Sequence, residues 1–180
     1  MNTAAEPRST IEPARRGRWW AHCTRQLGAY GMTAVLGVGA IGSLARGCED
    51  DPPTPRERVV QITNERRVEN GQPRVRANAK LNEAAQLHSR YQARNDRMSH
   101  EGSDGSDPGT RIRRQGYRYS TWGENVAAGY RTANDVMRGW MNSPGHRANI
   151  LNGRFTDIGI GLATSADGTR YWTMVLARPA

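Results

Sequence analysis

An uncharged, apolar run from residue 27 to residue 44, LGAYGMTAVLGVGAIGSL, divides this 180-residue chain into two unequal parts. Arginines precede the run at positions 8, 15, 16, 18 and 25. A basic flank before an apolar run is typical of a secretory signal or a membrane anchor, and this run is about long enough to cross a bilayer once. The alternative is a buried core helix, but no complementary apolar surface lies nearby in the sequence. We therefore predict a basic N-terminal region (1–26), a signal-peptide or transmembrane anchor segment (27–44), a linker (45–56) and a folded domain (57–180).

The fate of the apolar segment is open between three alternatives. It can stay as an uncleaved anchor or be removed as an ordinary signal peptide. The third is a lipoprotein signal, because Leu44-Ala45-Arg46-Gly47-Cys48 is similar to a lipoprotein box, which would make Cys48 the lipidated residue. All three predict an extracytoplasmic domain, secreted or membrane-anchored.

Both cysteines, Cys23 and Cys48, lie in or beside this leader, so the predicted domain contains none. An exported domain without disulfides must be stabilised by its hydrophobic core. The length that remains is typical of a single domain.

The chain has a net charge of +9 and a sequence pI near 10.5. From residue 54 onward, 20 basic residues oppose 12 acidic ones, so the folded part holds most of the charge. Such a basic domain invites a nucleic-acid interpretation. We predict no nucleic-acid partner, because the arginines are scattered and aromatic residues do not interleave with them. Attraction to an anionic envelope surface is the simpler consequence.

The spacing of apolar residues predicts helices in the first part of the domain and a β-hairpin at its C-terminal end. Apolar positions at helical spacing favour helices from residue 56 to about 70, from Asn78 through Tyr91, and from 133 to 142. Residues 99–109 read as a polar loop before a short helix at 110–115, and 116–122 as a strand or a turn. Alternating apolar residues from Phe155 and a turn at 165–168 predict an antiparallel hairpin. This order predicts the α+β class.

The helix that ends near residue 142 is followed by Ser143-Pro144-Gly145 and then His146. Proline and glycine predict a break there, which would hold His146 at a corner where side chains can converge on a site. Ser143 has two interpretations: a turn-stabilising serine, which we favour, or a nucleophile activated by His146.

His100, Glu124 and His146 are residue types that bind zinc, and an open zinc site uses three protein ligands. Their separations of 24 and 22 residues match no compact zinc motif. His88 lies on the apolar face of its helix and is predicted to be a core residue. Asn125 is predicted to fix its own loop by local hydrogen bonds.

Four sequence blocks occur in an order that resembles the CAP superfamily. This superfamily is named for cysteine-rich secretory proteins, antigen 5 and pathogenesis-related 1 proteins, and its fold is also called the SCP domain. The blocks are Leu81-Asn82-x-Ala84-Ala85-x-x-His88-Ser89, Met98-Ser99-His100, Gly123-Glu124-Asn125, and the stretch from Trp140 to Leu151. The resemblance covers residues 57–178 and is closest to the bacterial, cysteine-free branch.

The resemblance implies an α-β-α sandwich, with a small antiparallel sheet between helices and a ligand-binding cleft on one side. In the family, two histidines and two glutamates line this cleft, and several members bind a divalent metal such as zinc there. His100, Glu124 and His146 match three of these positions, and Ser143 stands where the second glutamate would be. The resemblance thus implies a cleft of four residues with three candidate zinc ligands.

Two functions from different classes follow as expectations. The first is an exported, CAP-type binding domain whose cleft takes an envelope lipid, a glycan or a cell-wall fragment, with or without a divalent metal. The second is a metal-assisted hydrolase acting on peptide or cell-wall polymer, with Glu124 as the candidate general base.

Overall fold

A computed structural model describes residues 51–180, which include the predicted domain. The predicted anchor segment, the lipoprotein-like stretch and both cysteines lie outside the described residues. Among residues 51–180, no helix combines the length and the apolar character needed to span a bilayer.

The first helix, α1 (Pro55–Glu69), begins inside the predicted linker. Thr54 caps it in a reciprocal capping box with Glu57, and Pro55 occupies its first turn. Proline is tolerated there, because the first N–H groups of a helix have no intrahelical partner. The linker prediction was therefore wrong in its final two residues.

Four further helices follow: α2 (Ala79–Arg94), α3 (Pro108–Arg114), α4 (Ala133–Asn142) and α5 (Pro144–Leu151). The break predicted at 143–145 is present, but Pro144 starts a new helix there instead of an open corner. His146 consequently lies in the first turn of α5. The physical reason is the same as at Pro55: a proline that ends one helix can open the next.

The strands are β1 (Arg76–Ala77), β2 (Tyr119–Ala128), β3 (Asp157–Thr164) and β4 (Arg170–Pro179). They form one sheet in the order β1-β3-β4-β2. β4 pairs antiparallel with both β2 and β3, whereas the two-residue β1 pairs parallel with β3. The predicted hairpin is confirmed, and the Gly123-Glu124-Asn125 triplet lies inside a strand.

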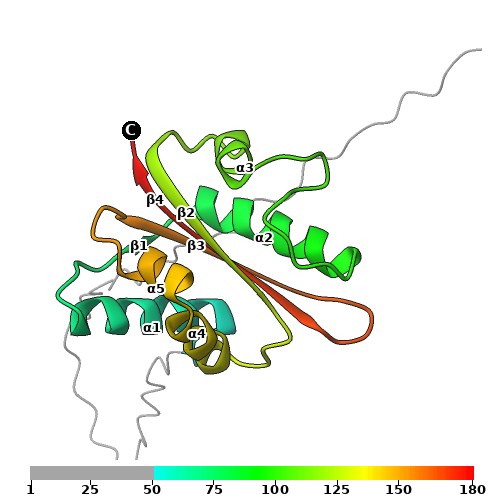
Figure 1. Ribbon diagram of the computed structural model, residues 1–180, viewed down its shortest axis with the longest axis horizontal. Helices are drawn as coiled ribbons and strands as arrows, with labels where there is room; N and C mark the ends of the chain where they lie inside the picture. The colour runs from blue at the N-terminus through cyan, green and yellow to red at the C-terminus, as the bar shows by residue number, and fades with distance from the viewer. Residues whose placement is uncertain (1–50) are drawn as a thin grey trace, which may run out of the picture. The chain divides into compact units, whose positions relative to one another are not determined.

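Helices cover both faces of the sheet, so the predicted α+β sandwich is confirmed. In Figure 1, α1, α4 and α5 lie on one side of the strands and α2 and α3 on the other. One buried cluster joins α1, α4 and α5 to residues such as Ile158, Ile160 and Trp172. A smaller cluster joins Leu81 of α2 and Ile112 of α3 to the opposite face.

Helix α2 lies unusually close to β3 because two glycines face it. A Cβ atom on Gly159 would lie 2.1 Å from the carbonyl carbon of Leu81, and one on Gly161 would lie 2.2 Å from the carbonyl oxygen of Ala85. No side chain fits at these distances. The Ile158-Gly159-Ile160-Gly161 pattern therefore places large residues on one face of β3 and helix backbone on the other.

Side-chain amides of α2 continue the hydrogen bonding of β3 beyond the short strand β1. The backbone N–H of Ile160 donates to Oδ1 of Asn82 at 2.9 Å. The backbone N–H of Leu162 donates to Oε1 of Gln86 at 3.2 Å, and Nε2 of Gln86 donates to the carbonyl of Leu162 at 2.8 Å. The outer edge of β3 is thus paired by a helix where no neighbouring strand is present.

A buried arginine connects α1 to the segment that follows α5. Arg67 has no exposed surface, and its guanidinium donates to the carbonyl oxygens of Pro73, Ile150, Asn152 and Phe155 at 2.7–3.1 Å. Burial lowers its pKa. Four backbone carbonyls here replace the carboxylate that a buried cation normally needs.

Candidate functional site

The buried carboxylate of Glu124 is the centre of the candidate site. Strand β2 carries it, and its side chain is 2% exposed. Its Oε1 accepts a hydrogen bond from Nδ1 of His100 at 2.9 Å, and its Oε2 accepts one from Arg111 at 2.7 Å. Both oxygens are therefore bound to cationic or donor groups.

His100 lies on the loop after α2 and keeps most of its imidazole in solvent, with 56% of its side chain exposed. Its hydrogen bond to Glu124 raises the pKa of the imidazole. Since Nδ1 is the donor in this bond, Nε2 is the nitrogen that remains for a ligand. This carboxylate–imidazole arrangement fixes the ring orientation.

Arg111 of α3 holds three acceptors at once. Besides Glu124, its guanidinium donates to the backbone carbonyls of His100 at 2.9 Å and Ser106 at 2.7 Å. Arg111 thus fixes the loop that carries His100 as well as the carboxylate that orients it. No sequence pattern distinguishes it from Arg113 and Arg114 on the same short helix, so its role could not be predicted from the sequence.

His146 belongs to α5 and is half-buried. Burial lowers the pKa of its imidazole, and the nearby charge of His100 lowers it further. The two histidines are therefore close enough to interact electrostatically and have opposite pKa shifts. Within the described part of the chain, no hydrogen bond joins His146 to His100 or to Glu124.

Two asparagines position the backbone at His146. Nδ2 of Asn125 donates to the carbonyl of His146 at 3.1 Å, and Nδ2 of Asn149 donates to Oδ1 of Asn125 at 2.8 Å. The prediction that Asn125 forms local loop bonds was wrong, because Asn125 is a buried strand residue. Neighbouring strand residues point to opposite faces, so Glu124 faces α2 and α3 while Asn125 faces α5.

Ser143 lies between α4 and α5 and is half-buried. It occupies the N-cap position of α5, the turn that it was predicted to stabilise, yet within residues 51–180 its side chain makes no capping hydrogen bond. Among the described residues, no hydrogen bond links its hydroxyl to His146. The serine–histidine nucleophile is accordingly not assembled.

His88 is buried, as predicted for a core residue, but it also lies next to Glu124. Its Nε2 donates to the carbonyl of Ser99 at 2.7 Å and lies 4.0 Å from Oε1 of Glu124. Its Nδ1 has no hydrogen-bond partner among residues 51–180. Burial lowers the pKa of this imidazole, so the neutral form is favoured.

The three predicted zinc ligands do not converge on one point. Within residues 51–180, no three side chains of His, Cys, Asp or Glu are arranged to hold a metal ion together. Glu124 uses its two oxygens to bind His100 and Arg111, and among the described residues its side chain makes no hydrogen bond to His146. As placed, these residues do not provide the three-ligand set of an open zinc site. The zinc site was predicted from the sequence, and a zinc titration is its direct test.

The model of the cysteine-rich secretory protein family (CAP) matches residues 60–176. The chain is 34% identical over 117 residues to the uncharacterised protein YkwD of Bacillus subtilis. It is 28% identical over 109 residues to YlbC, an uncharacterised membrane protein of the same bacterium. These matches cover 65% and 61% of this chain but only 44% and 32% of the relatives, so the chain spans less than half their length.

Solved structures agree with this assignment. An extracellular protein with an SCP domain from Bacillus anthracis is 28% identical, with a TM-score of 0.63 over 69% of this chain and 40% of that one. An outer surface protein from Borrelia burgdorferi has the same TM-score at 20% identity, over 68% of this chain and 90% of that one, and shows the same fold. The chain therefore belongs to the CAP family, the cysteine-rich secretory protein family.

Proposed function

We propose that this chain is an extracytoplasmic binding domain whose site around Glu124 takes a polar fragment of the cell wall. The observation that carries the proposal is the state of Glu124: its two oxygens bind His100 and Arg111, which leaves an oriented, exposed imidazole beside it. Similar proteins described as extracellular or outer-surface support the location.

The ligand chemistry follows from the groups that reach solvent. The raised pKa of His100 favours its charged form, whereas the lowered pKa of His146 favours its neutral form. A donor whose protonation is favoured, near an imidazole whose protonation is disfavoured, suits a ligand with carboxylate and hydroxyl groups. Among the expected ligands, a wall fragment or glycan fits this polarity better than a lipid.

A metal-assisted hydrolase is less well supported by the same geometry. A general base needs a carboxylate oxygen within reach of a water molecule, and both oxygens of Glu124 are engaged. Calorimetric titration of the full chain with zinc tests whether the chain binds this metal. We expect no stoichiometric binding. Stoichiometric zinc binding that is lost in His100→Ala would establish the metal site. In that case the ion pair between Glu124 and Arg111 would have to break so that the carboxylate could bind the metal.

Calorimetric titration of the full chain with a soluble disaccharide-peptide fragment of peptidoglycan tests the binding proposal. We expect His100→Ala to weaken binding by about tenfold, which corresponds to about 1.4 kcal/mol. Arg154→Ala is the matched control, because Arg154 is exposed and forms no ion pair among the described residues. Equal affinities of the wild-type and His100→Ala chains would contradict the proposal. Turnover of the fragment that disappears in Glu124→Gln would favour the hydrolase instead.

A further inference from the structure

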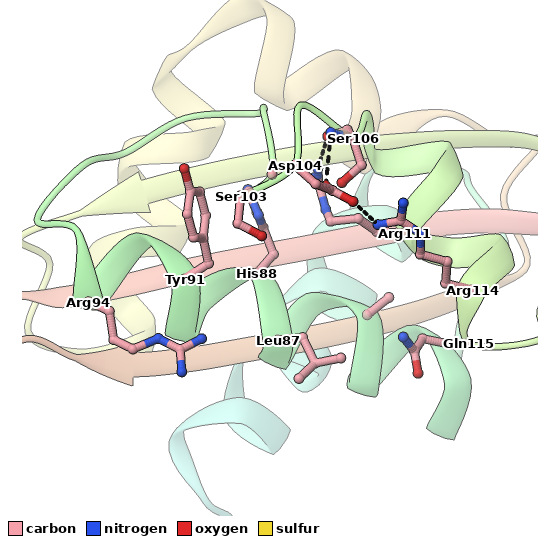
Figure 2. A pocket seen from close by; sticks show the side chains of 12 residues that line it. Leu87, His88, Tyr91, Arg94, Ser103, Asp104, Ser106, Arg111, Arg114 and Gln115 are labelled. Atoms are coloured by element: carbon pink, nitrogen blue, oxygen red, sulfur yellow. Dashed lines mark hydrogen bonds and ion pairs between the residues drawn. The ribbon is translucent and has the colours of Figure 1, made fainter. Parts of the chain in front are cut away.

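Two cavities lie along α2 and share one side chain. The first, of about 240 Å³, lies between α2, the loop before α3, and α3 itself (Figure 2). The second, of about 380 Å³, lies between the end of α2 and the turn that joins β3 to β4. Arg94 lines both cavities. The two hollows therefore meet at Arg94, and we call them together the α2 groove.

The first cavity combines an aromatic ring with several hydrogen-bonding groups. Figure 2 shows Tyr91 and Arg94 at one end and Arg114 and Gln115 at the other. The Tyr91 ring stacks on His88 at a centroid distance of 6.1 Å, and Leu87 in the lining is 41% exposed. Its volume lies below the roughly 300–1,000 Å³ of drug-sized sites, so it suits a single ring.

The uncompensated charge of the α2 groove is positive. Arg111 is paired with Glu124, and Arg114 is paired with Asp104 at 2.6 Å. Arg90 and Arg94 form no ion pair with residues 51–180. The second cavity also contains Asp96, which offsets one of these two charges.

We propose that the α2 groove binds an anionic glycan, with a sugar ring against Tyr91 and Leu87 and its acidic group at Arg90 and Arg94. An aromatic face with polar neighbours suits the mixed apolar and hydroxylated surface of a sugar. The arginines line hollows, which a flexible chain can enter and a flat membrane surface cannot. This second site goes beyond the function proposed above. It lies next to the Glu124 site, because His88 and Arg111 line the first cavity and also contact Glu124.

Titration of the full chain with oligogalacturonate, a short chain of carboxylated sugar rings, tests the proposal. We expect binding at low ionic strength that a neutral malto-oligosaccharide of equal length does not reproduce. Arg94→Glu should weaken it about tenfold more than Arg154→Glu, which changes the net charge by the same amount away from the groove. Arg90→Glu should act in the same direction as Arg94→Glu.

Several outcomes would overturn the proposal. If the wild-type chain does not bind oligogalacturonate, the α2 groove is not an anionic glycan site. If Arg94→Glu and Arg154→Glu weaken binding equally, the glycan is attracted by the net charge of the chain and not by the α2 groove. If Arg94 is instead needed for binding to phosphatidylglycerol vesicles, the partner is a membrane. His100→Ala should leave oligogalacturonate binding intact, which separates this test from that of the Glu124 site.

Discussion

At the scale of single residues, the carboxylate of Glu124 connects an exposed histidine to a partly buried arginine. Neither partner is next to it in sequence, since Arg111 comes from α3 and His100 from the loop before it. The orientation of His100 and its raised pKa both depend on this one side chain.

Glu124→Gln removes the negative charge and keeps the shape. We expect the pKa of His100 to fall toward its ordinary value, as measured by NMR titration of its ring protons. Arg111 would lose a charged partner that is 2% exposed, which lowers the free energy of unfolding by about 2–3 kcal/mol. Glu101→Gln, on the exposed loop, is the control and should change neither quantity.

His88 and His100 should affect the pH dependence of stability in opposite directions. Burial lowers the pKa of His88 below 6.5, so the unfolded chain binds a proton that the native chain does not. The free energy of unfolding should therefore fall as the pH drops below 6.5, by at most about 1.4 kcal/mol per pH unit from this group. His100 has a raised pKa, so its contribution is fully present below 6.5 and is lost as the pH rises through its native pKa.

Chemical denaturation between pH 5 and pH 8 measures both effects. His88→Gln should reduce the loss of stability on the acid side, and His100→Gln should reduce the loss on the alkaline side. An unchanged acid-side slope in His88→Gln would show that His88 is protonated in the native state.

At the scale of elements, the contact between α2 and β3 depends on glycines that no side chain can replace. Gly159→Ala would place a methyl group 2.1 Å from a backbone carbon of Leu81, so the helix would have to move. We expect the free energy of unfolding to fall by about 3 kcal/mol in urea denaturation. Gly145→Ala is the matched control, because a methyl group on Gly145 would meet no other atom within 4 Å, and its effect should stay within about 0.5 kcal/mol.

Elements with a regular apolar period were predictable, and elements that depend on distant partners were not. The faces of α2 and α4 followed from residues spaced by three and four. Helix α5 was missed because proline signals both the end of one helix and the start of another. Strand β2 was missed beyond Trp122 because Gly123, Glu124 and Asn125 are polar or small, and their pairing with β4 is not visible locally.

At the scale of the whole molecule, the two hydrophobic clusters share one sheet. β4 contributes Trp172, Met174 and Leu176 to one cluster and Val175 and Ala177 to the other. Loss of packing in either cluster therefore disturbs β4, which also carries residues of the other cluster. We infer that the described domain unfolds as one cooperative unit.

Substitutions on opposite faces test this cooperativity. Val136→Ala in α4 and Ile112→Ala in α3 each remove buried methyl groups, so each should lower the free energy of unfolding by about 1–4 kcal/mol. Thermal melts followed by near-UV and far-UV circular dichroism should coincide in both variants. Separate transitions for the two probes would mean that the faces unfold independently.

The sequence suggested the residue types of the candidate site but not the contacts among them. The resemblance to the CAP superfamily predicted His100, Glu124 and His146 as lining residues, and the structure joins the first two by a hydrogen bond. It could not show that Arg111 occupies one oxygen of Glu124, or that strand alternation turns Asn125 rather than Glu124 toward α5. Such contacts depend on the register of β2 against β4 and on the path of a polar loop.

The amides of Asn82 and Gln86 along β3 also have a consequence for behaviour in a crowded medium. A free strand edge can recruit a strand from another copy and start a growing fibril. The helix occupies the N–H groups of Ile160 and Leu162, so this edge offers no template to an incoming chain. This edge of the sheet is thereby protected from self-templated polymerisation by two side chains, in a domain whose residues 51–180 include no cysteine.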